Sequence, residues 1–482
     1  MSVRVRFAPS PTGYLHVGGL RTALYNYLFA RHNGGKCILR IEDTDRTRLV
    51  ENATESLIQS LHWAGIDFDE SPVEQGEYGP YIQSERLSIY REHVNILLDK
   101  GEAYYAFDSS EDLDAMRQRL QSGADHRYDR MNMRNELTIG IDETKRLIDG
   151  GAEYVIRLKV PENQDIEFDD IIRGRVVVSS NEVDDQVLLK SDGFPTYHLA
   201  NVVDDRLMAI THVIRGEEWL PSTPKHILLY KAFGWTSPEF AHLPLLLNAD
   251  KTKLSKRQGS VAVEDFIDQG YFKEAFVNFI ALLGWNPSAD REIYTIEELI
   301  QFFALDKVNK AGAVFDRTKL EWMNFQYMKT KPSEELAEFL RKELEKLNIE
   351  QYSMTYLAKV CDLLRERVNF IREIPEYAPY LFAKPGDYDE EYKEKHWKEN
   401  TKELLSTLIE EYRKTEEFTH DNTHEITKQF VEQSGIKLKD IIHPLRLMLT
   451  GRSVGAGMFE TMAVLGKAEC LSRFELFLEG KN

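Results

Sequence analysis

Cysteine is scarce in this chain, and its thiols stand far apart. Cys37, Cys361 and Cys470 are the three cysteines among 482 residues. They form neither a disulfide framework nor a closely spaced metal-ligand pair. This pattern predicts a cytoplasmic protein whose lone thiols are buried packing residues.

Long apolar runs and compositional bias are also missing. No run approaches the roughly 20 apolar residues that a membrane-spanning helix needs, and we expect residues 1–7 to form a strand rather than a secretory leader. Hydrophobic residues make up 42% and charged residues 29% of the chain, which are globular values that exclude a disordered class. The length is too great for one core, so we expect three to five domains.

Positive charge is in deficit, and the formal net charge is −19. This argues against non-specific binding to a nucleic acid, because such binding depends on Lys and Arg displacing counterions. It does not exclude one basic face, since the screening length in cells is about 8 Å and local patches act independently of the total.

The first 41 residues have the pattern of a βαβ unit. In residues 3–7 apolar side chains alternate with Arg4 and Arg6, as in a strand edge. From Gly18 onward apolar residues fall at helical spacing, and residues 37–41 form a second apolar run. A βαβ unit of this length is the building block of a nucleotide-binding parallel sheet.

The loop of this unit carries the motif PSPTGYLHVGG at residues 9–19. Main-chain amides at a helix N-terminus suit a phosphate, and Gly18 and Gly19 let a ligand approach the backbone closely. His16 at the loop mouth can donate a hydrogen bond to an α-phosphate as charge develops. The alternative is a loop histidine beside a tight turn.

A second motif, KLSKR, follows about 240 residues later at residues 253–257. Lys253, Lys256 and Arg257 can neutralise a pyrophosphate leaving group. A solvated basic turn is the alternative for this stretch taken alone. Both motifs together indicate one ATP site that is closed from two sides.

The expected secondary structure changes twice along the rest of the chain. We expect helices at 54–64 and 85–100, then a polar inserted lobe with strands at 154–160 and 174–178. Residues 198–207 and 212–216 resume the sheet-and-loop character of the opening region, and helices dominate after about residue 320.

Five ordered blocks of the sequence resemble bacterial glutamyl-tRNA synthetases of class I. Two C-terminal stretches, 444–451 (PLRLMLTG) and 457–467, are similar to the anticodon-binding end of that family. The five blocks are RFAPSPTG at 6–13, LHVGG at 15–19, RIEDTD at 40–45, RGEEW at 215–219 and KLSKR at 253–257.

The resemblance implies an α/β fold: a Rossmann-like catalytic domain with an inserted acceptor-binding lobe, followed by an all-α anticodon-binding C-terminal half. The expected division is 1–104 and 196–247 for the halves of the catalytic domain, 105–195 for the inserted acceptor-stem lobe, 248–330 for a loop-bearing stem-contact domain, and 331–385 and 386–482 for two helical anticodon-binding domains.

The resemblance also implies the reaction and its partners. Glutamate attacks the α-phosphorus of MgATP to give glutamyl-adenylate and pyrophosphate, and the 2′-hydroxyl of the terminal adenosine of tRNA(Glu) takes the glutamyl group. Members usually need bound tRNA before the first step and are usually monomers. Whether tRNA(Gln) is also charged stays open.

Residue by residue, the resemblance assigns two sets to the active site. Arg6 and Arg215 correspond to positions that hold the side-chain carboxylate of glutamate, which a guanidinium fork suits. Glu42 corresponds to the position that receives the α-ammonium, and Ser10, Tyr197 and Asn201 complete the pocket. Without the motifs, Arg6 would be a strand-edge charge and Glu42 a surface salt bridge. The catalytic and ATP-binding positions are His16, Gly18, Gly19, Glu218, Lys253 and Lys256.

For the tRNA, Arg446 matches an anticodon contact of the family, with Met458 near it. Arg367, or else Arg365, is the candidate that reads the third anticodon base. Arginines of the inserted lobe are candidates for phosphate contacts, with solvated surface charges as the alternative: Arg127, Arg130, Arg134, Arg157, Arg173 and Arg175.

One departure concerns zinc. Many relatives carry a zinc knuckle in the inserted lobe, with Cys-x-Cys after a Tyr-rich strand, but here residues 103–109 read AYYAFDS. No cysteine lies between Cys37 and Cys361, and zinc needs about four N or S ligands. We therefore predict no structural zinc.

Two other functions compete. Glutaminyl-tRNA synthetase shares the fold, but it typically reads Pro-Glu-Pro-Asn-Gly where this chain has PSPTG, and its anticodon domains are β-barrels. A catalytically silent tRNA-binding paralogue would have no use for a pyrophosphate loop. Short paralogues that modify a tRNA base lack the anticodon half, so the length excludes them.

Overall fold

The computed structural model describes residues 2–120, 127–255 and 260–480. The chain divides into two units, one of residues 1–269 and 273–317 and the other of residues 270–272 and 318–482. Lys256 and Arg257 of the second motif lie outside the described residues. Among the helices that are described, none combines the length and the apolar character that crossing a membrane requires.

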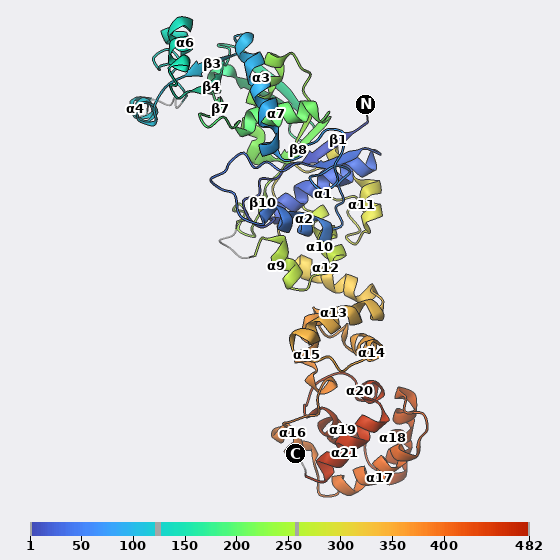
Figure 1. Cartoon of the computed structure of the whole chain (residues 1–482). Coiled ribbons are helices and arrows are strands. Elements are labelled where there is room, and N and C mark those ends of the chain that lie inside the picture. The colour runs from blue at the N-terminus through green and yellow to red at the C-terminus, as the bar shows by residue number, and fades with distance from the viewer. Residues whose placement is uncertain (1, 121–126, 256–259, 481–482) are drawn as a thin grey trace. The chain divides into compact units, whose positions relative to one another are not determined.

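The chain begins with the predicted βαβ unit (Figure 1). Strand β1 (Arg4–Phe7) leads into helix α1 (Val17–His32), and strand β2 (Lys36–Leu39) pairs with β1 in parallel, with Val5 opposite Cys37. A parallel pair requires a crossover connection, which α1 supplies.

The prediction that β1 is a strand edge was wrong, because all four of its residues are buried. Arg4 forms an ion pair with Glu70 at 2.8 Å, and Arg6 forms one with Asp205 at 3.0 Å. Both carboxylates lie outside the motifs. A strand of a parallel sheet is covered on both faces, so these arginines are buried with partners from elsewhere in the chain.

A second sheet has the strand order β6-β5-β9-β8. Its members are β5 (Asp165–Asp170), β6 (Gly174–Ser179), β8 (His212–Gly216) and β9 (Glu239–Leu243). Strands β8 and β9 are parallel, with Arg215 opposite His242, and Asp170 at the end of β5 pairs with Phe240. This register brings Asp170, His242 and Arg215 to neighbouring positions on three strands.

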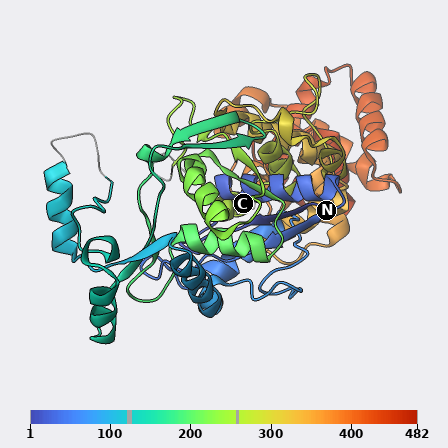
Figure 2. The same cartoon turned by 90° about the horizontal axis from the view of Figure 1, so that it is seen from above.

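The two sheets meet at β1 and β8. The amide of Thr211 donates to the carbonyl of Arg4 at 2.9 Å, and in Figures 1 and 2 the blue and green parts of this unit lie side by side. The carboxyl ends of β1 and β8 therefore lie at one edge, where ligands of open α/β sheets bind.

Residues 198–207 were predicted to have sheet-and-loop character, and this was wrong. They form helix α7 (Tyr197–Leu207), in which all seven residues from 199 to 205 are buried. A helix buried on every side has no amphipathic period to recognise. Asp204 and Asp205 also make the helix harder to predict. Acidic residues are usually exposed, but these two are buried against arginines from distant segments of the chain.

A third, antiparallel sheet has the order β3-β4-β7, formed by β3 (Ala103–Ala106), β4 (Val155–Leu158) and β7 (Val187–Leu189). Helices α4 (Ser110–Leu120), α5 (Glu136–Ile139) and α6 (Ile141–Asp149) lie between its first two strands in the sequence. A small cluster that includes Tyr104, Met116 and Tyr128 packs this region.

Further helices complete the first unit, and the helices predicted at 54–64 and 85–100 are confirmed. They are α2 (Ala53–Trp63), α3 (Leu87–Asp99), α8 (Thr223–Phe233), α9 (Val263–Asp268), α10 (Lys273–Ala281) and α11 (Ile296–Phe302). Two short strands, β10 (Leu246–Leu247) and β11 (Ala313–Val314), pair in parallel.

Residues 318–480 contain helices and no strand, as predicted. The buried side chains of Leu405, Tyr412, Met448 and Phe474 belong to one core there. The six-part division of the chain stays a prediction. The helices are α12 (Arg317–Thr330), α13 (Ser333–Lys346), α14 (Met354–Leu364), α15 (Ile374–Tyr377), α16 (Glu390–His396), α17 (Thr401–Lys414), α18 (His420–Ser434), α19 (Lys439–Thr450), α20 (Met458–Leu465) and α21 (Lys467–Leu478).

Candidate active site

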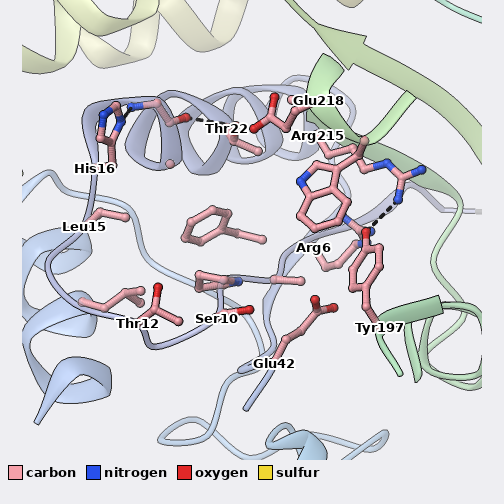
Figure 3. A pocket seen from close by; sticks show the side chains of 18 of the residues that line it. Arg6, Ser10, Thr12, Leu15, His16, Thr22, Glu42, Tyr197, Arg215 and Glu218 are labelled. Atoms are coloured by element: carbon pink, nitrogen blue, oxygen red, sulfur yellow. Dashed lines mark hydrogen bonds between the residues drawn. The ribbon is translucent and has the colours of Figure 1, made fainter. Parts of the chain in front are cut away.

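A cavity of about 390 Å³ lies at the carboxyl ends of β1 and β8 (Figure 3). Its walls come from the loop after β1, the start of α1, the first turn of α7 and the residues after β8. The structure brings together here the six residues predicted to bind glutamate and four of those predicted to bind ATP. They are Arg6, Ser10, Glu42, Tyr197, Asn201 and Arg215, with His16, Gly18, Gly19 and Glu218.

The start of α1 is shaped by His16 and the glycines that follow it. His16 is the N-cap residue, and its Nδ1 accepts a hydrogen bond of 3.0 Å from the amide of Gly18. In the neutral ring Nε2 therefore carries the proton and is the donor. A Cβ at Gly19 would lie 3.0 Å from the Leu15 side chain, so the absence of a side chain keeps this turn tight.

A second cavity, of about 300 Å³, adjoins the first at the same turn. Lys253 and Leu254 of the KLSKR motif line it, and it shares His16, Gly18 and Glu218 with the first cavity. The described part of the second motif therefore faces the helix terminus that the first motif builds.

Backbone hydrogen bonds tie both flanks of the second motif close to this turn. The amide of Leu254 donates to the carbonyl of Leu246 at 2.9 Å. After the motif, the amide of Val17 donates to the carbonyl of Val261, and that of Val263 to the carbonyl of Leu15, both at 2.9 Å. The described residues on either side of positions 256–259 are therefore held near the start of α1.

Arg215 is the positive group of the cavity that lacks a counter-charge. Its side chain donates to the Tyr197 hydroxyl at 2.8 Å, to Thr223 Oγ1 at 2.9 Å and to His242 Nε2 at 3.1 Å. Arg215 is 4% exposed, and within the described ranges no carboxylate forms an ion pair with it.

The histidines near Arg215 add no negative charge and little positive charge. Burial lowers the pKa of His198 to about 3 and that of His226 well below its usual range. Nearby cations, Arg215 among them, add to this lowering. Burial also lowers the pKa of His242, although Asp170 opposes this. A buried charge without a partner is costly, so this cavity suits an anionic ligand group.

Arg6 lies in the same cavity, but its charge is already compensated. Asp205 accepts from Arg6 at 3.0 Å and from the fully buried Arg40 at 2.8 Å, and Arg40 also donates to Glu42 at 3.0 Å. Arg6 is therefore a weaker candidate for the ligand carboxylate than Arg215. Arg40 and Asp205 had no predicted role; the available signal was an arginine within the apolar run at 37–41, which needs a carboxylate partner if it is buried.

Glu42 supplies the opposite charge. Its carboxylate points into the cavity in Figure 3, and Arg40 donates to its Oε1 at 3.0 Å. Burial raises the pKa of Glu42, while Arg40 and Arg6 oppose this rise. The cavity thus presents a guanidinium and a carboxylate to one ligand.

Trp219 also lines the cavity, and no role was predicted for it. Its ring lies 4.4 Å from that of Tyr197, centroid to centroid, and it is 39% exposed. Its place in the block at 215–219, which begins with Arg215 and in which it follows Glu218, could have indicated that it lines the site.

Three arginines of the predicted acceptor lobe stabilise the fold instead of facing solvent. Arg157 is 6% exposed and lies 3.9 Å from the centre of the Tyr128 ring, so its prediction as a phosphate contact was wrong. Arg130 pairs with Asp185 at 3.0 Å, and Arg173 donates to the carbonyl of Lys310 at 2.8 Å. Arg127, Arg134 and Arg175 stay candidates.

In the helical unit, the two candidates for the third anticodon base differ in their contacts. Arg365 donates to the carbonyl of Lys331 at 2.8 Å and contacts Asp362 and Ser333. Arg367 is exposed, and no side-chain partner of it occurs in the part of the chain that the structure describes. Arg367 is therefore the better candidate.

Arg446 and Met458 lie close to each other, as predicted. Arg446 lies in α19 and donates to the carbonyl of Ala456 at 2.8 Å, just before α20 begins at Met458. Met458 is 4% exposed, so Arg446 is the better placed of these two residues to contact a base.

Comparison with known proteins agrees with this geometry. Residues 2–322 match the model of the catalytic domain of class I tRNA synthetases (E and Q), and residues 332–478 match an anticodon binding domain. The chain is 51% identical over 488 residues to a glutamate–tRNA ligase of Chloroherpeton thalassium, covering 98% of this chain and 97% of that protein. It is 49% identical over 491 residues to the glutamate–tRNA ligase of Chlorobaculum parvum, covering 99% and 98%.

A solved structure is also similar over the whole chain. The crystal structure of a glutamate tRNA ligase from Elizabethkingia meningosepticum in complex with its amino acid has a TM-score of 0.93, is 41% identical, and is covered over its full length. The helical residues 318–480 also differ from the β-barrels expected of a glutaminyl enzyme. The chain therefore belongs to the glutamate–tRNA ligases of the class I aminoacyl-tRNA synthetases.

Proposed function

We propose that the chain activates L-glutamate with MgATP and transfers the glutamyl group to the 3′-terminal adenosine of tRNA(Glu). One observation carries the assignment of the site: Arg215 is buried, forms no ion pair with any carboxylate of the described residues, and lies on a cavity that Glu42 and the start of α1 also line. A ligand with a side-chain carboxylate and an ammonium group matches both charges.

The γ-carboxylate of glutamate binds at Arg215 and Tyr197. The Tyr197 hydroxyl accepts from Arg215, so its own proton is left for a ligand oxygen. Charge-assisted hydrogen bonds to a guanidinium are strong. Glutamine would present an NH₂ group to these donors, and the contact would be repulsive and unsatisfied.

The α-ammonium binds at Glu42, and Ser10 and Asn201 line the same region. This leaves the α-carboxylate of glutamate to attack the α-phosphorus of ATP. The new bond is an acyl–phosphate bond, and the bond to pyrophosphate breaks as its electron pair leaves with the pyrophosphate.

ATP binds across the start of α1, with Mg²⁺ as part of the substrate. The amides of Gly18 and Gly19 and the proton on His16 Nε2 stabilise the charge that develops on the α-phosphate. Lys253 lines the adjoining cavity and neutralises the leaving pyrophosphate, and Lys256 belongs to the same motif.

The helical half contacts the anticodon through Arg446 and Arg367, since unstacked bases can be hydrogen-bonded there, and the buried Met458 lies near Arg446. A monomer in the cytoplasm and the lack of structural zinc stay predictions. Elemental analysis of protein purified without added metal tests the zinc prediction, and stoichiometric zinc would contradict it.

ATP–pyrophosphate exchange tests the proposed reaction. Exchange should depend on L-glutamate and be stimulated by tRNA(Glu), and the same protein should charge tRNA(Glu). Charging of tRNA(Gln) in parallel decides whether one or both tRNAs are substrates. Absence of glutamate-dependent exchange with tRNA present would contradict the proposal and favour a tRNA-binding role without catalysis.

A further inference from the structure

A chain of two hydrogen bonds holds the guanidinium of Arg215 from behind. Asp170 Oδ2 lies 2.6 Å from His242 Nδ1, and Arg215 Nε donates to His242 Nε2 at 3.1 Å. The three residues come from β5, β9 and β8, neighbours in one sheet. Neither Asp170 nor His242 lines the cavity that holds Arg215.

The chain of bonds fixes the protonation of His242. Burial opposes ionisation of Asp170, but its bonds to His242 and to backbone amides outweigh this and lower its pKa, so it is a carboxylate that accepts only. His242 Nδ1 must then carry the ring proton. The neutral ring leaves a lone pair on Nε2, which is the acceptor that Arg215 Nε requires.

The other bonds of Arg215 depend on this anchor. Nη1 donates to the Tyr197 hydroxyl at 2.8 Å and lies 3.4 Å from His226 Nδ1, and Nη2 donates to Thr223 Oγ1 at 2.9 Å. Thr223 Oγ1 also lies 3.1 Å from His242 Nε2, where it can donate to the same lone pair. Nε, Nη1 and Nη2 each donate to an acceptor within the protein. These bonds fix the orientation of the guanidinium, and therefore the direction in which the second N–H of Nη2 can donate to a ligand.

We propose that Asp170 and His242 are positioning residues for glutamate selectivity, which keep the guanidinium of Arg215 oriented for a carboxylate by holding His242 in the tautomer that accepts. This rests on the proposed function, since Arg215 is taken as the group that receives the γ-carboxylate. Neither residue touches substrate; both act through Arg215.

The variant Asp170→Asn tests this with almost no change of shape. Asp170 Oδ1 accepts from the amides of Ile172 at 3.0 Å and Arg173 at 2.8 Å, so the oxygen of an asparagine keeps that place. Its NH₂ group then replaces Oδ2 and donates to His242 Nδ1. The ring proton moves to Nε2 and opposes Arg215 Nε–H, donor against donor.

The expected result is a split between kinetic constants. Asp170→Asn should raise the KM for glutamate about 10- to 100-fold, the range of one charged hydrogen bond. The KM for ATP should stay within about twofold, and the preference for glutamate over glutamine in tRNA-dependent exchange should fall. His242→Ala removes the same acceptor and should give a similar rise, and it serves if the asparagine variant fails to fold.

The double variant separates positioning from general damage. If Asp170 acts through His242, then Asp170→Asn combined with His242→Ala should have the glutamate KM of His242→Ala alone. Independent defects would multiply. Glu70→Gln is the matched control, because Glu70 is also a buried carboxylate of this unit, paired with Arg4 and away from the cavity. It should lower the melting temperature without changing glutamate KM.

The outcomes are distinguishable. A wild-type protein without glutamate-dependent exchange would overturn the proposed function itself. With wild-type exchange intact, an unchanged glutamate KM in Asp170→Asn would overturn the positioning role. Equal rises of glutamate and ATP KM, multiplicative effects in the double variant, or the same KM rise in Glu70→Gln would do so as well.

Discussion

Removal of the Arg215 side chain is the perturbation that the structure constrains most tightly. Arg215→Ala takes away a guanidinium that is 4% exposed and has no counter-charge among the described residues. Truncating one partner of a buried, hydrogen-bonded charge pair costs about 2–5 kcal/mol. We therefore expect the KM for glutamate to rise by about 30-fold to about 4,000-fold, and that for ATP to change little.

The assay is ATP–pyrophosphate exchange with saturating tRNA(Glu), with glutamate and ATP varied in turn. Arg206→Ala is the control, because Arg206 lies on the same helix as Tyr197 but is exposed. Thermal unfolding of both variants shows whether the fold survives. A glutamate KM within twofold of wild type in Arg215→Ala would refute the reasoning.

Three further predictions concern other charges. Burial raises the pKa of Glu42, so the wild-type KM for glutamate should begin to rise on acidification at a higher pH than it would with an ordinary carboxylate. Glu42→Gln should raise this KM and make it less dependent on pH. A wild-type KM for glutamate that does not depend on pH would contradict this. Asp205→Asn weakens the compensation of two buried guanidinium groups and should lower the free energy of unfolding by about 3–5 kcal/mol in urea titrations, whereas a loss below 1 kcal/mol would argue against it. Arg367→Ala should raise the KM for tRNA without changing the melting temperature. Arg365→Ala should mainly lower the melting temperature, since Arg365 donates to the carbonyl of Lys331. The reverse pattern would make Arg365 the anticodon contact.

Local features of the fold could be predicted from the sequence. The βαβ start follows from apolar spacing within 41 residues, and the helices at 54–64 and 85–100 follow from their own helical patterns. These features depend on neighbours in the chain, which a pattern records directly.

Features that depend on distant partners could not be predicted. The burial of Arg6 requires Asp205, which lies 199 residues away. Helix α7 is buried on all sides, so its hydrophobic period is lost. The contact of His242 with Asp170 spans 72 residues and depends on sheet order, which no motif encodes.

The same contrast explains the candidate site. The ten predicted residues that line the cavity were assigned by matching to family positions, and that matching gave Arg6 and Arg215 the same role. Only the contacts separate them, because one guanidinium has a buried carboxylate partner and the other has none among the described residues. Chemical roles within a matched set therefore depend on charge balance in three dimensions.

A crystal structure with L-glutamate bound would show directly which arginine receives the γ-carboxylate. We expect the γ-carboxylate within about 3 Å of the Arg215 guanidinium and the Tyr197 hydroxyl, with the α-ammonium at Glu42. A γ-carboxylate on Arg6 instead, or glutamate bound in the reverse direction with its ammonium away from Glu42, would contradict this expectation.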